Sequence, residues 1–324
     1  MNAKTRNLKF HQKTDDDRLR IGLALGSGSA RGWAHIGVIQ ALKEMGVEPE
    51  IVAGTSIGAI VGAAYAGDRL DDLEKWVRSL NWKKIVQFLD MSPLRGGFIQ
   101  GEKLYEFAHT HVQDMTIDSL PRTLGVVATD LDTGREVWFQ DGPLLEAVRA
   151  SIGLPGLFAP VKLNGRWLVD GGLTNPVPIS LCRAMGADVI IAVNLNGDIV
   201  GKHARNRKGR SERASVSENA EAAFLERMSS QLKSSLHETT DELWSRLFGE
   251  SQETPGMLEV LASSLNIMQD RITRSRMGGD PPEIILSPRL AHLGLMEFDQ
   301  ADIAIEEGRA AVQRMKPAIE QILS

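Results

Sequence analysis

The chain has 324 residues, of which 42% are hydrophobic and 24% are charged, and its formal net charge at pH 7 is −5. These values are ordinary for a globular protein and indicate neither a disordered chain nor a strongly basic, nucleic-acid-binding one. The single cysteine, Cys182, excludes a framework of internal disulfide bonds.

Four parts of the chain differ in their residue pattern. Residues 1–18 are polar and predict a disordered arm. Residues 19–197 alternate predicted strands and helices, which favours an α/β domain with a largely parallel central sheet. Residues 198–256 are polar, carry a basic cluster over 202–213, and predict an insertion that is partly disordered or helical. Residues 257–324 predict a helical C-terminal region that packs on the α/β domain.

Two apolar segments near the start predict strands that each run into a glycine-containing turn and then a helix. Residues 20–25 lead into Gly26, and residues 34–45 predict the first helix. Residues 51–53 lead into Gly54, and the small apolar residues 59–66 predict a helix buried against a sheet.

Two hairpins and a further strand are expected next. Residues 126–129 and 135–139 flank Asp132-Thr133-Gly134, and residues 161–163 and 166–169 flank Asn164-Gly165, a strong hairpin signal. The apolar run 188–193 predicts another buried strand.

The C-terminal part predicts a helix, an edge strand and a last helix. An amphipathic helix is indicated by apolar residues at spacings of three and four, namely Leu258, Leu261, Leu265, Met268 and Ile272. Residues 284–286 predict the edge strand, and the final helix spans about 305–322 with a kink at Pro317.

The segment Gly54-Thr55-Ser56-Ile57-Gly58 matches the G-x-S-x-G nucleophile elbow. In that motif a serine sits on a sharp strand-to-helix turn, and glycines on both sides relieve crowding. The predicted strand before Ser56 and the predicted helix after it are what the motif requires. The alternative interpretation is a tight turn with an incidental serine.

A second glycine-rich segment, Gly26-Ser27-Gly28-Ser29-Ala30-Arg31-Gly32, also follows a strand and opens a helix. Its amides could hold a phosphate or a transient oxyanion. The segment is not a dinucleotide fingerprint, because Arg31 stands where the third glycine of G-x-G-x-x-G belongs. It is not a Walker A loop either, because no Gly-Lys-Ser/Thr follows. An oxyanion hole fits best.

The candidate base for Ser56 is Asp170. It ends a predicted hairpin strand and precedes Gly171-Gly172, where other backbone can approach closely. A buried aspartate with a raised pKa can take the serine proton directly. The alternative is a plain turn at Asp170, with a histidine as base. His203 and His237 lie in the polar segment 198–256, and His292, which has no special context, would be the base of an ordinary Ser-His-Asp hydrolase.

Together these three segments resemble the patatin-like phospholipase family, which combines a G-x-R-G loop, a G-x-S-x-G serine and an Asp-Gly-Gly/Ala motif in this order. Residues 20–197 resemble the whole patatin domain. Three flanking segments are also similar to it: Trp33-Ala34-His35-Ile36-Gly37-Val38, Arg149-Ala150-Ser151-Ile152-Gly153-Leu154-Pro155 and Phe158-Ala159-Pro160-Val161. Residues 276–282 are similar to the bacterial RssA-type branch, which is related to neuropathy target esterase. The loop departs from the commoner family pattern, in which three glycines stand at Ser27-Gly28-Ser29.

The resemblance implies a patatin-like three-layer fold with a central, largely parallel sheet flanked by helices, plus a helical C-terminal extension. It implies a carboxylic ester hydrolase of lipid metabolism, with lipid acyl esters or phospholipids as substrates and a Ser-Asp dyad in place of a triad. Ser56 would be the nucleophile and Asp170 the general base. Gly28 and Ser29 would form the oxyanion hole, Arg31 and Gly32 would support the loop, and Gly54 and Gly58 would shape the elbow. Arg31 could instead meet an anionic head group.

No metal or cofactor is indicated by the residue spacings, and no nucleic-acid partner is expected. Without an apolar stretch of about 18 residues or a secretory signal, we expect a cytoplasmic protein. The basic residues of 202–213 could give weak, salt-sensitive contact with the inner face of the membrane. A rival from another class is a catalytically weak regulatory or adaptor protein on a patatin scaffold.

Overall fold

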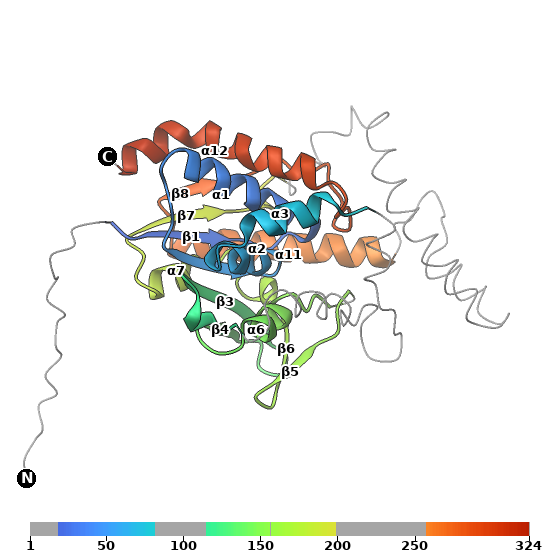
Figure 1. The fold of residues 1–324 in the computed structure, drawn as a ribbon. Coiled ribbons are helices and arrows are strands. Elements are labelled where there is room, and N and C mark those ends of the chain that lie inside the picture. The colour runs from blue at the N-terminus through green and yellow to red at the C-terminus, as the bar shows by residue number, and fades with distance from the viewer. Residues whose placement is uncertain (1–18, 82–114, 156, 199–256, 324) are drawn as a thin grey trace, which may run out of the picture.

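The computed structural model describes residues 19–81, 115–155, 157–198 and 257–323. Their centre is a mixed eight-stranded sheet with the strand order β5-β6-β3-β2-β1-β7-β8, in which β4 also pairs with β3 (Figure 1). The predicted arm over 1–18 and the predicted insertion, including the basic cluster, lie outside the described residues apart from residue 198. The proposed division of the chain at residue 197 therefore stays a prediction.

Five parallel strands make the middle of the sheet and one of its edges. They are β1 (Ile21–Leu25), β2 (Ile51–Thr55), β3 (Thr123–Asp130), β7 (Val189–Val193) and β8 (Ile284–Leu286). β2 and β7 are buried along their whole length, as expected for parallel strands with both faces covered. The predicted α/β fold with a largely parallel sheet is confirmed, as is the predicted edge strand.

Both predicted hairpins form and supply the antiparallel strands. β4 (Glu136–Phe139) pairs with β3, and β5 (Val161–Leu163) pairs with β6 (Arg166–Asp170). Asn164 and Gly165 both have positive φ, 49° and 79°, which is the conformation of a two-residue type I′ turn. β6 also pairs with the end of β3, so its last residue lies opposite Ala128 in the middle of the sheet.

Helices cover both faces of the sheet. Successive side chains of β1 point to opposite faces of the sheet and pack in two separate cores. Leu23 and Leu25 pack in the first core, and Ala24 packs in the second. The first core is covered by α1 (Ala34–Glu44), α2 (Ile57–Ala66), α3 (Leu70–Arg78), α6 (Leu144–Ser151) and α12 (Ala301–Leu323). The second is covered by α7 (Ile179–Ala184) and by Met277 of α11 (Met257–Gly279). The result is a three-layer α/β/α arrangement (Figure 1).

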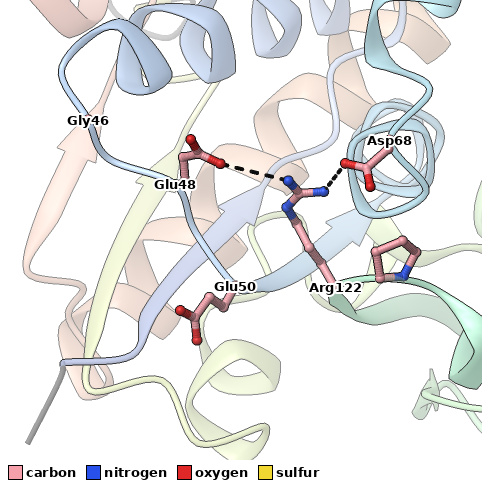
Figure 2. Close-up of a pocket in the computed structure, with 6 residues that line it drawn as sticks. Gly46, Glu48, Glu50, Asp68 and Arg122 are labelled. Atoms are coloured by element: carbon pink, nitrogen blue, oxygen red, sulfur yellow. Dashed lines mark hydrogen bonds and ion pairs between the residues drawn. The ribbon is translucent and has the colours of Figure 1, made fainter.

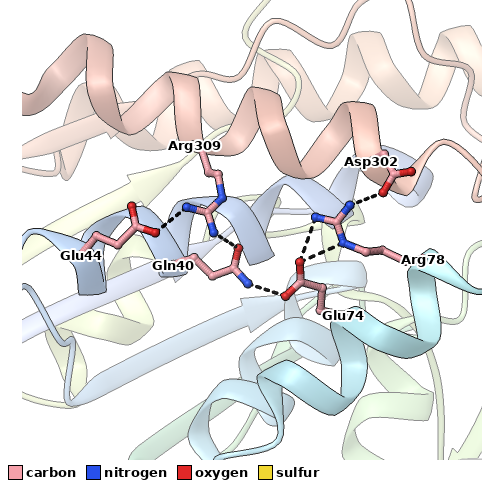
Figure 3. Close-up of polar contacts among 6 residues, drawn as sticks. All are labelled: Gln40, Glu44, Glu74, Arg78, Asp302 and Arg309. Atoms are coloured by element: carbon pink, nitrogen blue, oxygen red, sulfur yellow. Dashed lines mark hydrogen bonds and ion pairs between the residues drawn. The ribbon is translucent and has the colours of Figure 1, made fainter.

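The last helix, α12, packs closely on α1. A Cβ at Gly37 would lie 1.8 Å from the carbonyl oxygen of Ile305, so only glycine permits this approach. Figure 3 shows the polar contacts that join α12 to α1 and α3, formed by Gln40, Glu44, Glu74, Arg78, Asp302 and Arg309. Arg309 donates to Glu44 Oε1 and to Gln40 Oε1, both at 2.6 Å. The C-terminal helix is therefore part of the same packed body as the sheet.

The predicted helix α11 forms, but its apolar stripe is not its buried face. Leu261 and Met268 are 45% and 47% exposed, whereas Gln269, Asp270 and Thr273 are buried. The spacing of apolar residues predicted the helix but not its buried face, because polar side chains of α11 meet loops at the end of the sheet, while Met277, near its C-terminal end, packs against the second core. Within the described residues, no helix is both long and apolar enough to cross a membrane.

Candidate active site

Ser56 stands on a sharp turn between β2 and α2. Its backbone dihedrals, φ 58° and ψ −123°, lie outside the regions that residues other than glycine usually adopt. Strained dihedrals of this kind are typical of a nucleophile elbow, in which the serine projects from the turn. Ser56 is half-buried, and it directly precedes the first residue of α2, so the positive end of that helix lies beside its hydroxyl.

The two glycines of the motif allow this turn because backbone passes directly over them. A Cβ at Gly54 would lie 2.5 Å from the carbonyl oxygen of Gly58, and a Cβ at Gly58 would lie 2.2 Å from that of Leu25. The amide of Ser56 donates to Ser151 Oγ at 2.8 Å, and Ser151 is fully buried at the end of α6. The elbow is thus held by its own glycines, by the backbone of Leu25 at the end of β1 and by Ser151 of α6.

Asp170 lies beside Ser56. Ser56 Oγ donates to Asp170 Oδ2 at 2.6 Å, and the amide of Gly172 donates to the other carboxylate oxygen, Oδ1, at 2.7 Å. The backbone of Asp170 is also fixed, because its amide donates to Gly153 O at 3.0 Å and its carbonyl accepts from Thr129 Oγ1 at 2.9 Å. The structure therefore brings together the predicted serine and the predicted acid.

Asp170 is buried, with 1% of the residue exposed, and this burial raises the pKa of its carboxyl group. Burial raises the pKa of Asp170 to about 6, against the hydrogen bonds from Ser56 and Gly172, which lower the pKa by stabilising the charged form. At neutral pH the group is a carboxylate that is more basic than an ordinary aspartate. Such a group is suited to accept a proton from the serine hydroxyl with which it is in contact.

The glycine-rich loop at the end of β1 packs against the elbow. A Cβ at Gly32 would meet the side chain of Ile57 at 2.2 Å, and the short 3₁₀ helix η1 (Ser29–Trp33) follows Gly28 directly. The amides of Gly26, Ser27 and Ala30 donate to backbone carbonyls, while those of Gly28 and Ser29 have no acceptor among the residues that the structure describes. The assignment of Gly28 and Ser29 as oxyanion donors stays a prediction, and these two amides have no backbone acceptor among the described residues.

Ser29 takes the conformation that a glycine has in the commoner loop pattern. Its φ is 52°, in the left-handed region, where a side chain costs of order 1 kcal/mol. Its hydroxyl donates to Leu295 O at 2.6 Å, and the amide of Ala30 donates to the same carbonyl at 3.1 Å. The C-terminal segment before α12 thus holds Ser29 in this conformation.

Arg31 is buried under the loop, with 2% of its surface exposed. Its Nε donates to Gly28 O at 3.2 Å, and its Nη2 donates to Asn266 Oδ1 on α11 at 3.0 Å. Both contacts are with the protein, so the geometry favours loop support over the alternative of binding an anionic head group.

Several residues of the site lie outside the three motifs, and the sequence predicted no role for them, although Ser151 and His35 belong to flanking segments that resemble the family. Ser151 and Thr129 hold the backbone on either side of the Ser56–Asp170 pair, as described above. His35 is buried and donates from Nε2 to Gly26 O at 2.8 Å; burial lowers its pKa to about 4, against the effect of that hydrogen bond, so the ring is neutral. His35 belongs to a segment quoted for its family resemblance, and that was the one signal that pointed to it.

The candidate histidine His292 lies in the loop between β8 and α12 and is exposed, whereas Ser56 Oγ donates to Asp170. His203 and His237 lie outside the described residues. No group of three His, Cys, Asp or Glu side chains in the described ranges is arranged to hold a metal ion.

A hollow at the other end of the sheet is a weaker candidate for a site. Figure 2 shows its lining residues, which include Glu48, Glu50, Asp68 and Arg122. Glu50 precedes β2, while Ser56 follows it, so the hollow lies at the amino ends of the parallel strands. Arg122 is paired with Asp68 and, at 3.9 Å, with Glu48, and it lies over the ring of Tyr65. These charges satisfy one another, and nothing else about the hollow indicates a ligand.

Comparison with known proteins is consistent with the geometry at the carboxyl end of the sheet. The family model of patatin-like phospholipases matches residues 23–183. An uncharacterized NTE family protein of Mycobacterium tuberculosis is 36% identical over 333 residues, which cover 93% of this chain and 92% of that protein. Human patatin-like phospholipase domain-containing protein 6 is 36% identical over 182 residues, covering 54% of this chain and 13% of that protein. Lysophospholipase NTE1 of Coccidioides immitis is 34% identical over 185 residues, covering 54% and 11%.

Proposed function

The chain belongs to the patatin-like phospholipase family, and we propose that it hydrolyses acyl esters of phospholipids or lysophospholipids through an acyl-enzyme on Ser56. Membership of the family and the similarity to a protein named lysophospholipase support hydrolysis of lipid esters in general. The single observation that carries the finer proposal is the 2.6 Å hydrogen bond from Ser56 Oγ to the buried carboxylate of Asp170.

In the first half of the proposed reaction, Asp170 accepts the proton of Ser56 as Oγ attacks the ester carbonyl carbon. The carbonyl oxygen becomes an oxyanion, which the amides of Gly28 and Ser29 bind in the proposal. When the tetrahedral intermediate collapses, the C–O bond to the alcohol breaks and the proton on Asp170 passes to the leaving oxygen. The products are the free alcohol, or lysolipid, and an ester on Ser56.

In the second half, water takes the place of the alcohol. The water oxygen attacks the acyl carbon while Asp170 accepts a proton from that water. Asp170 then gives this proton to Ser56 Oγ as the ester bond to Ser56 breaks. The fatty acid leaves, and both groups regain their starting protonation states. A raised pKa suits Asp170 for this role, because the same group must take up and release a proton in each half-reaction.

The test is labelling with a fluorophosphonate, which phosphonylates an activated serine with loss of fluoride and does not require the natural substrate. We expect one modified serine, Ser56, identified by peptide mapping, and loss of both labelling and ester hydrolysis in Ser56→Ala. Equal labelling of Ser56→Ala and the wild type would overturn the proposal. Absence of labelling in a folded wild-type protein would favour the rival, a regulatory protein on a patatin scaffold.

Contact with a membrane and a cytoplasmic location are part of the proposal as predictions from the sequence. The basic cluster over 202–213 should give weak binding to anionic vesicles that fades as salt rises, because screening weakens attraction between exposed charges. Sedimentation with vesicles measures this. Binding that is unchanged by high salt, or by neutralising the basic residues of 202–213, would remove the cluster from this role.

A further inference from the structure

Helix α11 lies beyond residues 23–183, the segment that the family model matches, yet it contacts both loops of the candidate site. Asn266, Gln269, Asp270 and Thr273 have the spacing of neighbours on one helix face. The last three of them are at least 94% buried. A buried polar face on a long helix is expensive unless its groups make specific hydrogen bonds. Asp270 pairs with Arg274 of the same helix, and Thr273 Oγ1 has no hydrogen-bond partner among the described residues, so the contacts of Asn266 and Gln269 indicate what the helix does.

The first contact reaches the oxyanion loop. Asn266 Oδ1 accepts from Arg31 Nη2 at 3.0 Å, and Arg31 Nε donates to Gly28 O at 3.2 Å. The carbonyl of Gly28 and the amide of Ser29 belong to one planar trans peptide unit, so they point in opposite directions. Arg31, itself oriented by Asn266, fixes the direction of the Gly28 carbonyl and therefore the direction in which the Ser29 amide points.

The second contact reaches the loop that carries the acid. Gln269 Oε1 accepts from Asn196 Nδ2 at 2.9 Å, which orients the side-chain amide. Its other end, Nε2, then lies 2.6 Å from the position that a Cβ on Gly172 would occupy. Asp170 Oδ1 and Ser27 Oγ lie 2.9 and 3.0 Å from the same point. Gln269 thus fills the space beside the Cα of Gly172, the residue whose amide donates to Asp170 Oδ1.

The helix that bears both residues is itself attached to the domain at its C-terminal end. Arg276 pairs with Glu136 of β4 at 3.5 Å, and Asp280, just after the helix, pairs with Arg183 of α7 at 2.7 Å. One fixed helix therefore determines the positions of two loops that are more than 130 residues apart in the sequence, the loops of Gly28 and Asp170.

We infer that Asn266 and Gln269 are positioning residues for the hydrolysis, Asn266 for the proposed oxyanion donor Ser29 and Gln269 for the Asp170 loop. The inference rests on the proposed function and extends it to a helix outside the matched family segment. Neither side chain is proposed to touch the substrate. Their effect is on the orientation of groups that act in the transition state, so loss of either should lower kcat more than it raises KM.

The experiment compares Asn266→Ala and Gln269→Ala with the wild type, using a short-chain p-nitrophenyl ester and the rate of fluorophosphonate labelling. We expect kcat and the labelling rate to fall about 10- to 100-fold, less than the 10²- to 10³-fold typical for deleting an oxyanion donor itself, with KM within about threefold. Ser275→Ala, at an exposed position of the same helix, is the matched control and should behave as the wild type.

Conservative variants separate positioning from mere folding. Asn266→Asp keeps an acceptor for Arg31 and should retain most activity. Asn266→Leu keeps the side-chain volume but has no acceptor, so it should lose activity, and it replaces Asn266→Ala in the test if that variant does not fold. Gly172→Ala should be less harmful in the Gln269→Ala background than alone, because the atom at 2.6 Å is then absent. Wild-type kcat and labelling in both alanine variants, or equal loss in Asn266→Asp and Asn266→Leu, would overturn the inference. A folded wild type that neither labels nor hydrolyses would instead overturn the proposed function.

Discussion

Two serines of this protein, Ser56 and Ser29, both have positive φ, but they are held in this strained conformation in different ways. At the elbow, φ 58° is permitted by Gly54 and Gly58, two residues on either side of Ser56, although the backbone that passes over Gly58 is that of Leu25 and the Ser56 amide donates to Ser151. In the oxyanion loop, φ 52° at Ser29 is held by the carbonyl of Leu295, which is 266 residues away in the sequence. The comparison shows that the glycines that permit the turn at the proposed nucleophile are its neighbours in the sequence, whereas the conformation of the proposed oxyanion donor Ser29 depends on the C-terminal region.

The sharpest test on the elbow side removes the base. Asp170→Asn should keep the fold and lower kcat at least about 10³-fold, because a neutral amide cannot accept the proton of Ser56. Ester hydrolysis at pH 7 measures the loss. His292→Ala is the control, and it should change kcat by less than about tenfold, since this exposed histidine makes no contact with Ser56. An inactive His292→Ala together with an active Asp170→Asn would reverse the assignment of the base.

The second test breaks the local geometry of the elbow. Gly58→Ala places a methyl group 2.2 Å from the carbonyl of Leu25, a backbone atom that cannot move freely, and should lower the free energy of unfolding by about 3 kcal/mol or more. The matched control is Gly134→Ala, at φ 64° with open space around it, which should cost only about 1 kcal/mol from backbone strain. Urea unfolding compares the two. Equal losses would mean that crowding at the elbow is not what requires glycine.

The third test uses the pKa of Asp170, which is about 6 because the group is buried. If its carboxylate is the base, kcat/KM should fall about tenfold per pH unit below that value. Because the folded state favours the protonated form of Asp170, this group contributes its full stabilisation below about pH 3.8, the ordinary pKa of aspartate. That contribution is lost as the pH rises through 6. Asp170→Asn should therefore be up to about 3 kcal/mol more stable than the wild type at pH 7.

That stability advantage of Asp170→Asn should disappear below about pH 4, where both states of the wild type carry a protonated Asp170. Urea unfolding of the two proteins at pH 4 and pH 7 measures the difference. A variant that is equally stable, or less stable, at pH 7 would contradict the conclusion that burial of the charged carboxylate is costly.

The smallest expected effect belongs to the oxyanion loop. Ser29→Ala keeps the strained φ and loses the hydrogen bond to Leu295 O, so it should be destabilised by about 1 kcal/mol and label about three- to tenfold more slowly. Ser29→Gly loses the same bond but also loses the strain, and it should be close to the wild type in stability. Thermal unfolding and labelling rates distinguish the two. If Ser29→Gly is the less stable variant, strain at Ser29 is not significant.

The order of the elements was largely predictable because each depends on neighbours in the sequence. Alternation and turn residues gave the hairpin at Asn164-Gly165 and the strand before Ser56, and both form as expected. The apolar spacing of α11 predicted a helix correctly but not its buried face. Periodicity reports which residues share a face, and what covers that face depends on the elements that pack against it.

Within the candidate site, the sequence by itself determined the segments that carry Ser56, Asp170 and the Gly28 loop, since glycine at a close backbone approach leaves a signature in a few residues. The tertiary structure alone decided that Ser151 holds the Ser56 amide, that Leu295 holds Ser29, and that the buried acid has a raised pKa. It also decided that Asn266 and Gln269 lie beneath the two loops. These contacts join residues far apart in the chain. A serine hydroxyl, a backbone carbonyl or a side-chain amide has no sequence signature that identifies its partner, so only the fold shows which groups meet.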